Sequence, residues 1–207
     1  MPAATLAPHP WTRWALARSS GVWLWLWGTL ALVAMAALLL GGQPDVDAIR
    51  RVIRATARTS LCCFLLAYMA STLRRHGDTP WTQGLVRHRR WLGLLFASSH
   101  TLHAIAIGAL FMVAEPDLAR SLTPPISRWV GGAGYVALLA MALTSSDRAV
   151  QALGWARWQA LHRWGAHLIW LVFFLSMAKR APGSVGHAAM ALILLGLLAF
   201  KLRGGRP

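Results

Sequence analysis

The sequence is poor in charged residues, and above all in acidic ones. Only 13% of its 207 residues are charged, and six Asp and Glu stand against 21 Lys and Arg. Soluble domains carry about 25% charged residues, so an ordinary soluble domain is excluded. The cations occur in short clusters beside apolar runs, as membrane topology signals do. This distribution excludes a nucleic-acid-binding protein in spite of the formal net charge of +15.

Several motifs of soluble enzymes are also missing. The sequence has no Gly-rich phosphate loop, no Cys-x-x-Cys pair and no Ser/His/Asp arrangement. No flavin-binding or nicotinamide-binding motif can be recognised in it either. If the chain carries electrons, another protein must therefore supply or accept them.

What the sequence does have is apolar length. Six apolar segments predict an all-α integral membrane bundle of six transmembrane helices, which forms a single domain over residues 1–207. A spanning helix needs about 20 residues. The second segment is shorter, but Arg58 and Arg74 at its ends can snorkel to the interface and extend it. The six segments are residues 19–44, 59–73, 91–114, 129–146, 164–178 and 184–200.

The positions of the cations predict the orientation of the chain. The N-terminal tail, the second and fourth loops and the C-terminal tail together carry 13 of the 21 Lys and Arg residues. By the positive-inside rule, both termini lie in the cytoplasm. Before the second segment, Arg50, Arg54 and Arg58 recur every four residues. This spacing predicts a basic helix over residues 47–58 that lies at the membrane interface.

The third segment carries the first candidate ligands. A basic cluster at residues 87–90 is followed by 24 residues, 91–114, without a charged side chain. Inside this stretch, His100 and His103 lie about 60° apart on one helical face and about 4.5 Å apart along the axis. Ionisable side chains at membrane depth are costly and usually have a function. Hydrogen-bonded packing is the competing interpretation of such histidines.

A second histidine pair, His162 and His167, lies on the fifth segment. The third and fifth segments run in the same direction, so one imidazole from each can hold a haem iron between them. His162 and His167 point about 140° apart, and only one of them can face the third segment. His88 lies within about 60° of His103 on the third helix but about 22 Å away along it. That spacing suits two stacked haems, one near each leaflet.

Several short motifs occur in an order that resembles a known family. They are STLRR at 71–75, RRWLGLL at 89–95, LH at 102–103, ALTS at 142–145, LG at 153–154 and WQALHR at 158–163. In this order they resemble the ferric reductase-like transmembrane domain family, from about residue 58 to residue 180. Within that family, the nearest resemblance is to the haem-bearing membrane subunits of bacterial periplasmic methionine sulfoxide reductase systems.

The resemblance implies a six-helix b-type cytochrome of the bacterial inner membrane with one or two haem b groups. It implies electron transfer from the cytoplasmic side or from a quinone to a periplasmic oxidoreductase partner, within membrane lipid; a flavin is a further compatible cofactor. By position, His103 and His162 match the family's ligands on the third and fifth helices. A second fifth-helix histidine of the family corresponds to Leu175 here. Either one haem is bound, or another histidine, such as His167 or His187, replaces the missing ligand.

The depth of the ligands leaves their pairing open. If the third and fifth helices began at the same level, His103 and His162 would lie roughly 21 Å apart along the bundle axis, which is too far for one haem. Three alternatives remain: a fifth helix that begins near Trp155, a pairing of His88 with His162, and a pairing of His100 with His167.

Two other functions are compatible with the same sequence. The missing histidine at Leu175 favours a haem-free family member that acts as a membrane scaffold. The intramembrane histidines also fit a transporter or a proton path. The six segments contain no Asp or Glu, however, and ion paths usually include carboxylates.

Overall fold

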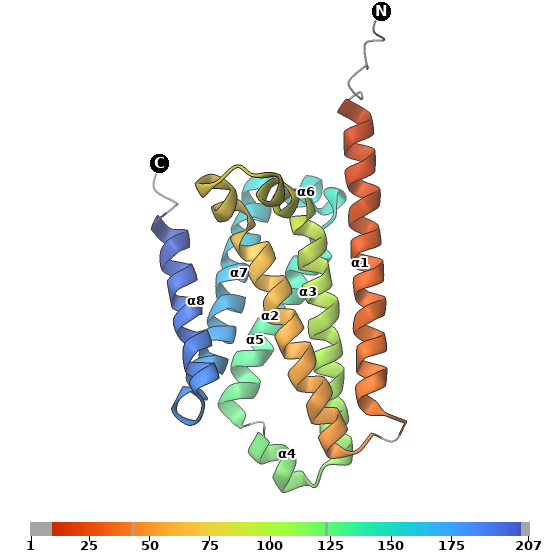
Figure 1. The fold of residues 1–207 in the computed structure, drawn as a ribbon, viewed down its shortest axis with the longest axis vertical. Coiled ribbons are helices and arrows are strands. Elements are labelled where there is room, and N and C mark those ends of the chain that lie inside the picture. The colour runs from red at the N-terminus through yellow and green to blue at the C-terminus, as the bar shows by residue number, and fades with distance from the viewer. Residues whose placement is uncertain (1–9, 43, 123, 204–207) are drawn as a thin grey trace, which may run out of the picture.

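The protein is a bundle of long helices standing side by side (Figure 1). The computed structural model describes residues 10–42, 44–122 and 124–203, and within this part of the chain all regular structure is helical, which confirms the predicted all-α class. The elements are α1 (Pro10–Leu40), α2 (Val46–His76), α3 (Pro80–Val113), α4 (Pro116–Leu122), α5 (Pro125–Leu143), α6 (Asp147–Leu153), α7 (Trp155–Ala178), the short 3₁₀ helix η1 (Ala181–Gly183) and α8 (Val185–Arg203).

Five of the described helices are long and apolar enough to cross a membrane. They are α1 (from Ser20), α2, α3, α5 and α8. The predicted fifth span lies in α7, which has 24 residues but is not among the five. It carries His162, Arg163 and His167, and these polar side chains lower its mean hydropathy. The candidate ligands themselves thus weaken the apolar signal of the helix that holds them.

The second helix differs from the prediction. The basic residues 47–58 do not form a separate helix, because α2 runs without a break for 31 residues from Val46 to His76. Asp45 caps its start by accepting a hydrogen bond from the Ala48 amide at 2.6 Å. Arginine is a good helix former, so the basic stretch interrupts the apolar run without interrupting the helix. The predicted helical conformation of residues 47–58 is therefore confirmed, the predicted helix limit at Arg58 is wrong, and the position of the basic face at the membrane interface stays a prediction.

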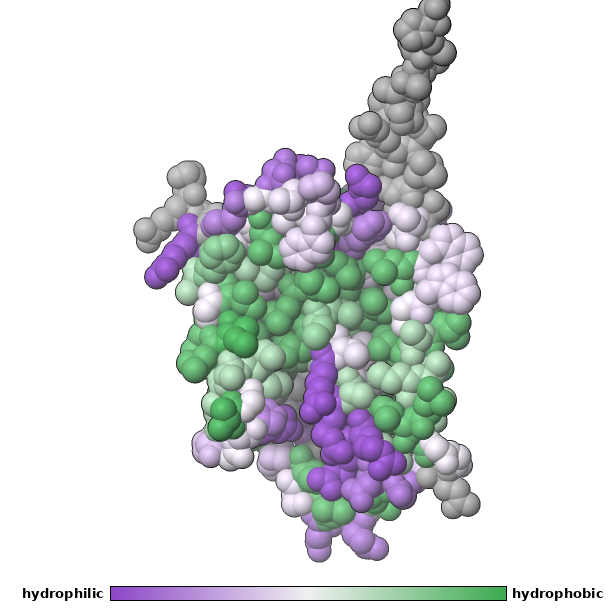
Figure 2. Space-filling view, in the orientation of Figure 1, coloured by the Kyte–Doolittle hydropathy of each residue, from purple (hydrophilic) through white to green (hydrophobic). Residues whose placement is uncertain are grey.

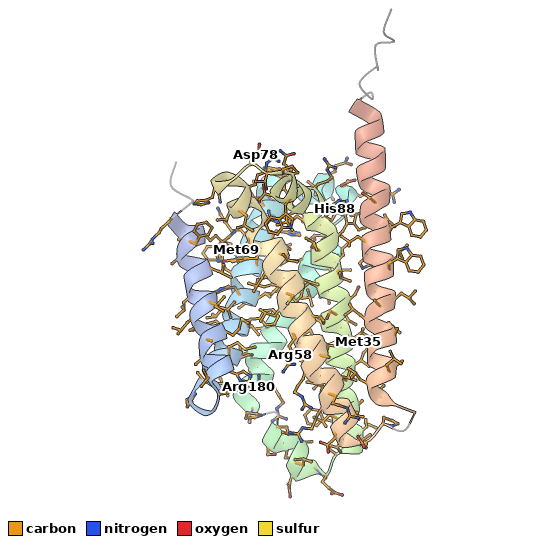
Figure 3. The ribbon with its side chains drawn as sticks, in the orientation of Figure 1. Met35, Arg58, Met69, Asp78, His88 and Arg180 are labelled. Carbon is orange, nitrogen blue, oxygen red and sulfur yellow. The ribbon has the colours of Figure 1, made fainter. Side chains whose placement is uncertain are left out.

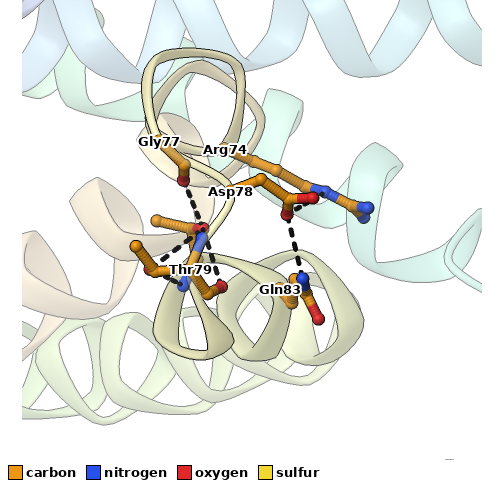
Figure 4. A network of polar contacts seen from close by, with 6 residues as sticks. Arg74, Gly77, Asp78, Thr79 and Gln83 are labelled. Carbon is orange, nitrogen blue, oxygen red and sulfur yellow. Dashed lines mark hydrogen bonds and ion pairs between the residues drawn. The ribbon is translucent and has the colours of Figure 1, made fainter.

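The third helix also begins earlier than its apolar run. Thr79 and Thr82 form a reciprocal capping box, with Thr79 N donating to Thr82 Oγ1 at 3.0 Å and Thr82 N donating to Thr79 Oγ1 at 3.3 Å (Figure 4). Pro80 stands at the first helical position, where its missing N–H is no loss. Asp78 accepts a hydrogen bond from Gln83 at 3.0 Å. The helix therefore starts at the turn, and the basic cluster at 87–90 is part of it.

The bundle has two ends, which we name by their short helices. The α6 end holds the start of α1, the turn between α2 and α3, α6 and the end of α8 (Figure 1). The α4 end holds the connection from α1 to α2, α4 and η1. As far as the described residues reach, the segments predicted to be cytoplasmic thus lie at the α6 end.

The helices pack as two groups. In one group, α2 packs closely on α3 and α1 leans on both; in the other, α7 packs against α5 and α8. We call the space between the α2–α3 pair and the α5–α7–α8 group the seam. Its middle is filled by three aromatic rings, since the Phe64 ring centre lies 5.4 Å from that of Phe96 and 5.5 Å from that of Phe173. The core is therefore aromatic where the two groups meet.

The outer helix α1 approaches α3 through two glycines. A Cβ added to Gly28 would lie 2.8 Å from Leu95 Cδ1, and one added to Gly21 would overlap the Trp91 ring. Small residues permit such close approach in a membrane, where lipid is as apolar as a leucine side chain. This contact lies on the side of α3 away from the seam, so α1 supports the site without lining it.

Candidate functional site

The seam-facing side of α3 carries His100 and His103. Their ring centres lie 5.2 Å apart with the planes only 16° from parallel. The His100 ring contacts Tyr135 of α5 at 4.7 Å and Phe173 of α7 at 5.8 Å. The structure therefore brings this pair together, as the spacing predicts, and turns it toward the opposite helix group.

The imidazole of His103 has a defined tautomer. Its Nδ1 lies 3.0 Å from the carbonyl oxygen of Ile53 on α2. A carbonyl only accepts, so Nδ1 carries the hydrogen, and Thr56 Oγ1, at 3.1 Å, shares it. Thr56 Oγ1 in turn donates to the Val52 carbonyl at 2.7 Å. The lone pair of His103 is left on Nε2, which is the arrangement that orients a histidine for binding a metal.

A cluster of hydroxyls fixes α2 against α3 next to this histidine. Ser60 Oγ donates to Ser99 Oγ at 2.9 Å, and Ser99 Oγ donates to the Thr56 carbonyl at 3.1 Å. Thr59 Oγ1 lies 2.8 Å from Ser99 Oγ. Thr56, Ser60 and Ser99 are completely buried. Buried hydroxyls that satisfy one another set the register of two helices, and here they set the level of His103 against Ile53.

His100 differs from His103 in having a polar atom without a partner. Its Nδ1 is buried and accepts or donates no hydrogen bond within the described part of the chain. Its backbone carbonyl accepts a hydrogen bond from the Tyr135 hydroxyl at 3.3 Å. An unsatisfied buried nitrogen among aromatic rings is costly, and it marks a place where a further group can be bound.

The histidines of α7 are engaged with hydroxyls instead. His162 Nε2 lies 3.0 Å from Thr144 Oγ1, and the Trp158 ring packs on the imidazole at 4.4 Å. Thr144 Oγ1 donates to the Ala140 carbonyl at 2.7 Å. Its single hydrogen is therefore used, and it accepts from His162 Nε2. In this arrangement the lone pair of His162 is on Nδ1.

His167 points to a different neighbour. Its Nδ1 lies 3.0 Å from the Tyr68 hydroxyl of α2. On the other side of Tyr68, Lys201 of α8 donates to the Tyr68 carbonyl at 2.9 Å and lies 4.4 Å from the centre of its ring. His167 thus belongs to a polar group near the end of α8, and the structure does not bring it to His100.

The candidates lie at two depths in the seam. His100 contacts Phe173, which lies roughly 16 Å further along α7 than His162. His103 lies about 4.5 Å beyond His100, so His103 and His162 are separated by roughly 20 Å in depth. His88 lies roughly 18 Å before His100 on α3, which is close to the depth of His162. The structure therefore does not bring His103 to His162, although α7 begins at Trp155.

At the deeper level, α8 offers another imidazole. His187 lies on the helical face that carries the buried residues Ala191 and Leu194, and its Nδ1 is buried without a described hydrogen-bond partner. The hydrogen bond from Trp170 Nε1 to the Leu194 carbonyl, at 3.3 Å, fixes α8 against α7. From Leu194, His187 lies roughly 10 Å toward the α4 end, a depth similar to that of His103.

Leu175, the position that matches a family ligand, is no part of the seam. Its side chain is 40% exposed and lies on the outer side of α7, opposite the core residue Phe173. The position at which this chain departs from the family pattern therefore lies on the face of α7 that points away from the bundle.

The arrangement suits a porphyrin better than a bare metal ion. In residues 10–42, 44–122 and 124–203, no group of three or more His, Cys, Asp or Glu side chains could hold a metal ion. A porphyrin supplies its own equatorial nitrogens and needs only axial imidazoles. His103, with a free Nε2, and His100, with an unsatisfied nitrogen, stand beside aromatic rings that can pack on a flat macrocycle. The residues present fit a haem.

The sequence analysis missed the groups that orient the histidines. Ile53, Thr56, Tyr68 and Thr144 each contact a histidine of another helix. The sequence separation is up to 99 residues, so no local pattern reveals these pairs. The one available signal is the group of hydroxyl residues at 56, 59 and 60, where the basic stretch meets the apolar span, which predicts a polar partner on a neighbouring helix.

Comparisons with known proteins agree with this architecture. Residues 55–173, more than half of the chain, match the family described as "Ferric reductase like transmembrane component". The chain is similar to the protein-methionine-sulfoxide reductase heme-binding subunit MsrQ of Salmonella arizonae, with 34% identity over 195 residues that cover 89% of this chain and 94% of the relative. The MsrQ subunit of Yersinia pseudotuberculosis is 32% identical over 189 residues, which cover 86% of this chain and 88% of the relative. No solved structure matches the chain.

Proposed function

The chain belongs to the ferric reductase-like transmembrane family, and we propose that it is the haem-bearing membrane subunit of a bacterial electron-transfer system. The proposal includes a multi-pass position in the inner membrane, with α7 as a sixth span beside the five apolar helices. The α6 end, where α1 begins and α8 ends, would face the cytoplasm.

One observation carries the proposal. His103 donates its Nδ1 hydrogen to the Ile53 carbonyl at 3.0 Å, which leaves Nε2 free within an apolar seam. A hydrogen bond at the second nitrogen is the usual means of fixing a ligating histidine.

Two levels of the seam would hold haem b. At the deeper level, His103 is the ligand from α3, and His187 of α8 is the imidazole at similar depth on the opposite group. At the level nearer the α6 end, His162 of α7 and His88 of α3 lie at similar depths. His88 also has a buried Nδ1 without a described partner.

When bound, the haem supplies one-electron chemistry. The chain's own residues orient and insulate it. The Ile53 carbonyl and the Thr56 hydroxyl hold the His103 ring, and Phe96 and Phe173, both nearly completely buried, keep water out of the seam. No side chain of the seam has to move a proton in this scheme.

We infer the partner from the names of the relatives and the direction from the predicted orientation of the bundle. The relatives are named as subunits of a protein-methionine-sulfoxide reductase, so the proposed electron acceptor is a periplasmic oxidoreductase of that kind, which would dock at the α4 end. The donor would be a cytoplasmic reductase or a quinone in the membrane.

The test is spectroscopic. The protein purified from haem-replete cells is expected to show a Soret band and a reduced-minus-oxidised spectrum of the b type. The pyridine haemochrome assay is expected to give two haems per chain, one for each level of the seam. His103→Ala is expected to remove the deeper haem. His76→Ala is the matched control, because His76 is exposed at the end of α2 and bonds to the Thr72 carbonyl. A colourless wild-type protein would contradict the proposal.

A further inference from the structure

Three stacked rings connect the surface at the α6 end with a candidate haem ligand. The ring centre of Trp155 lies 5.1 Å from that of Trp158, and the centre of the Trp158 ring lies 4.4 Å from that of the His162 imidazole, with interplanar angles of 23° and 30°. Residues three and four apart share one face of a helix, so the three rings follow one face of α7. Trp155 is 63% exposed, whereas Trp158 and His162 are half-buried. We call these three residues the ring stack.

The ring stack is held in one position by its neighbours. Trp158 Nε1 donates to the Thr144 carbonyl at 2.9 Å, and the hydroxyl of the same threonine lies 3.0 Å from His162 Nε2. Before the stack, Gly154 has a φ of 78°, a conformation that favours glycine. This turn ends α6 and lets α7 begin at Trp155. The first ring of α7 is therefore placed in line with a candidate ligand about two turns away.

The outer end of the ring stack lies outside the apolar layer. Trp155 is about 36 Å along α7 from Lys179, the cation that follows this helix, and the hydrocarbon core of a membrane is about 30 Å thick. On the face shown in Figure 2, hydrophilic side chains gather at the α6 end above an apolar band. Figure 3 shows His88 of α3 close to the same end, and His88 and His162 are the candidate ligands of the nearer haem level. The ring stack therefore leads from that level to the surface at the α6 end.

A second exposed tryptophan on the same helix has a different position. Trp164 is 70% exposed and points about 160° away from His162 around α7. It therefore faces lipid, as tryptophans of the membrane interface do. Trp155 lies within about 20° of His162 around the helix, and its ring is stacked toward that ligand. Trp164 thus suits anchoring, whereas Trp155 suits contact with a molecule that approaches from water.

The surface around Trp155 is basic. Arg148 of α6 and Arg157 of α7 are both exposed, and α6 packs beside the start of α7 (Figure 1). In the part of the chain that the structure describes, no carboxylate pairs with either arginine. Asp147 is close by in the sequence, but it pairs with Arg90 at 3.1 Å. A basic surface of this kind attracts a partner that has an acidic rim.

We propose that Trp155 is the docking contact for a water-soluble flavoprotein reductase, and that Trp155 and Trp158 shorten the path of its electron to the haem level of His162. The inference rests on the proposed function and names the class of the donor and its docking site. The exposed indole offers a stacking surface to a flat flavin ring, and Arg148 and Arg157 lie beside it for the acidic rim of the protein that carries the flavin. The reduced flavin is oxidised by one electron and releases a proton to water, and that electron reduces ferric iron to ferrous iron. No bond forms between the proteins, and neither indole is itself oxidised.

The experiment measures how fast two donors reduce the haem of the full-length protein in lipid nanodiscs. The donors are photoreduced FMN, which is anionic and water-soluble, and decylubiquinol, which dissolves in the membrane. In Trp155→Ala, reduction by FMN is expected to be about 3- to 10-fold slower than in wild type, as loss of a stacking contact would produce, and reduction by decylubiquinol is expected to be unchanged. Trp155→Phe is expected to keep most of the wild-type rate. Binding of oxidised FMN, measured by quenching of its fluorescence, is expected to weaken in Trp155→Ala by a similar factor.

Trp164→Ala is the matched control, because Trp164 is similarly exposed on the same helix but lies off the ring stack; it is expected to keep the wild-type rate with both donors. The haem content and spectrum of Trp155→Ala are expected to match those of wild type, because Trp155 stacks on Trp158 and not on the ligand. Equal rates of reduction by FMN in wild type and Trp155→Ala overturn the inference. So does equal slowing with both donors, which would assign Trp155 to a quinol site or to the surroundings of the haem. Wild-type protein without haem contradicts the proposed function itself, and this is seen before any variant is compared.

Discussion

The histidines of α3 and those of α7 are similar in number and setting but differ in what their nitrogens do. On α3, His103 keeps a free Nε2 and His100 has a buried nitrogen without a described partner. On α7, His162 and His167 each have one nitrogen at a hydroxyl, that of Thr144 and that of Tyr68. A histidine at membrane depth is thus not diagnostic by itself. The difference is in the described partners, since a backbone carbonyl of α2 holds His103 and hydroxyls hold the histidines of α7.

The largest expected effect separates the histidines by depth. His103→Ala and His162→Ala are each expected to remove one haem, and the double variant is expected to be colourless, because the two residues serve different levels of the seam. His167→Ala is expected to keep both haems, because His167 lies with Tyr68 near the end of α8 and neither proposed haem level uses it. Haem per chain, measured by pyridine haemochrome, decides the matter. Loss of both haems in His103→Ala alone would show that the levels are not independent.

A smaller effect is expected when the support of His103 is weakened and the ligand is kept. Thr56→Val removes the hydroxyl that shares the Nδ1 hydrogen of His103. Loss of such a supporting group is expected to weaken haem binding about 10- to 100-fold. Thr59→Val is the control, because Thr59 contacts Ser99 and no histidine. Equal haem retention in the two variants would contradict the role assigned to Thr56.

A substitution on α1 tests whether the side of α3 that contacts α1 affects the side that faces the seam. Gly21→Leu places a side chain against the Trp91 ring and is expected to lower the free energy of unfolding by about 1–3 kcal/mol, seen as an earlier thermal transition in detergent. The haem spectrum of the folded protein is expected to be unchanged, because this contact lies away from the seam. A shifted spectrum would mean that α1 does shape the site.

The smallest effect concerns the link between α3 and the segment that leads into α7. Arg90 pairs with Asp147 of α6 at 3.1 Å, with 37% and 62% of the side chains exposed. Exposed pairs contribute about 0–1 kcal/mol and are screened by salt. Asp147→Asn is therefore expected to shift the thermal transition slightly at low salt and not at high salt. A large shift that persists in salt would reveal a stronger contact than this pair.

The sequence was sufficient for the class of fold, because apolar length is a local signal. Intramembrane ionisable residues are also a local signal and identified the candidate histidines, whose role as ligands stays a prediction. Helix limits were predicted less well. The second and third spans were predicted to begin just after Arg58 and Arg90, because charged residues precede the apolar runs there. In the structure, helix caps at Asp45 and Thr79 set the starts of α2 and α3. Hydropathy indicates which residues can lie in the membrane, whereas capping residues indicate where a helix begins.

The orientation of the site could not be predicted for a different reason. His103 owes its tautomer to Ile53, which lies 50 residues earlier in the sequence, and His162 owes its hydrogen bond to Thr144 on another helix. These contacts depend on the register between helices, which no single segment determines. The exposed side chain of Leu175 likewise follows from how α7 is rotated in the bundle.

The hydroxyl cluster around Ser99 has a consequence for biogenesis. It joins α2 to α3, which are consecutive in the chain and connected by a capped turn. This hairpin can close as soon as its two helices enter the bilayer, before α5, α7 and α8 have been synthesised. The imidazole of His103 is then already oriented when the later helices enter the membrane. Binding of the cofactor can therefore be the step that brings α5, α7 and α8 against α2 and α3.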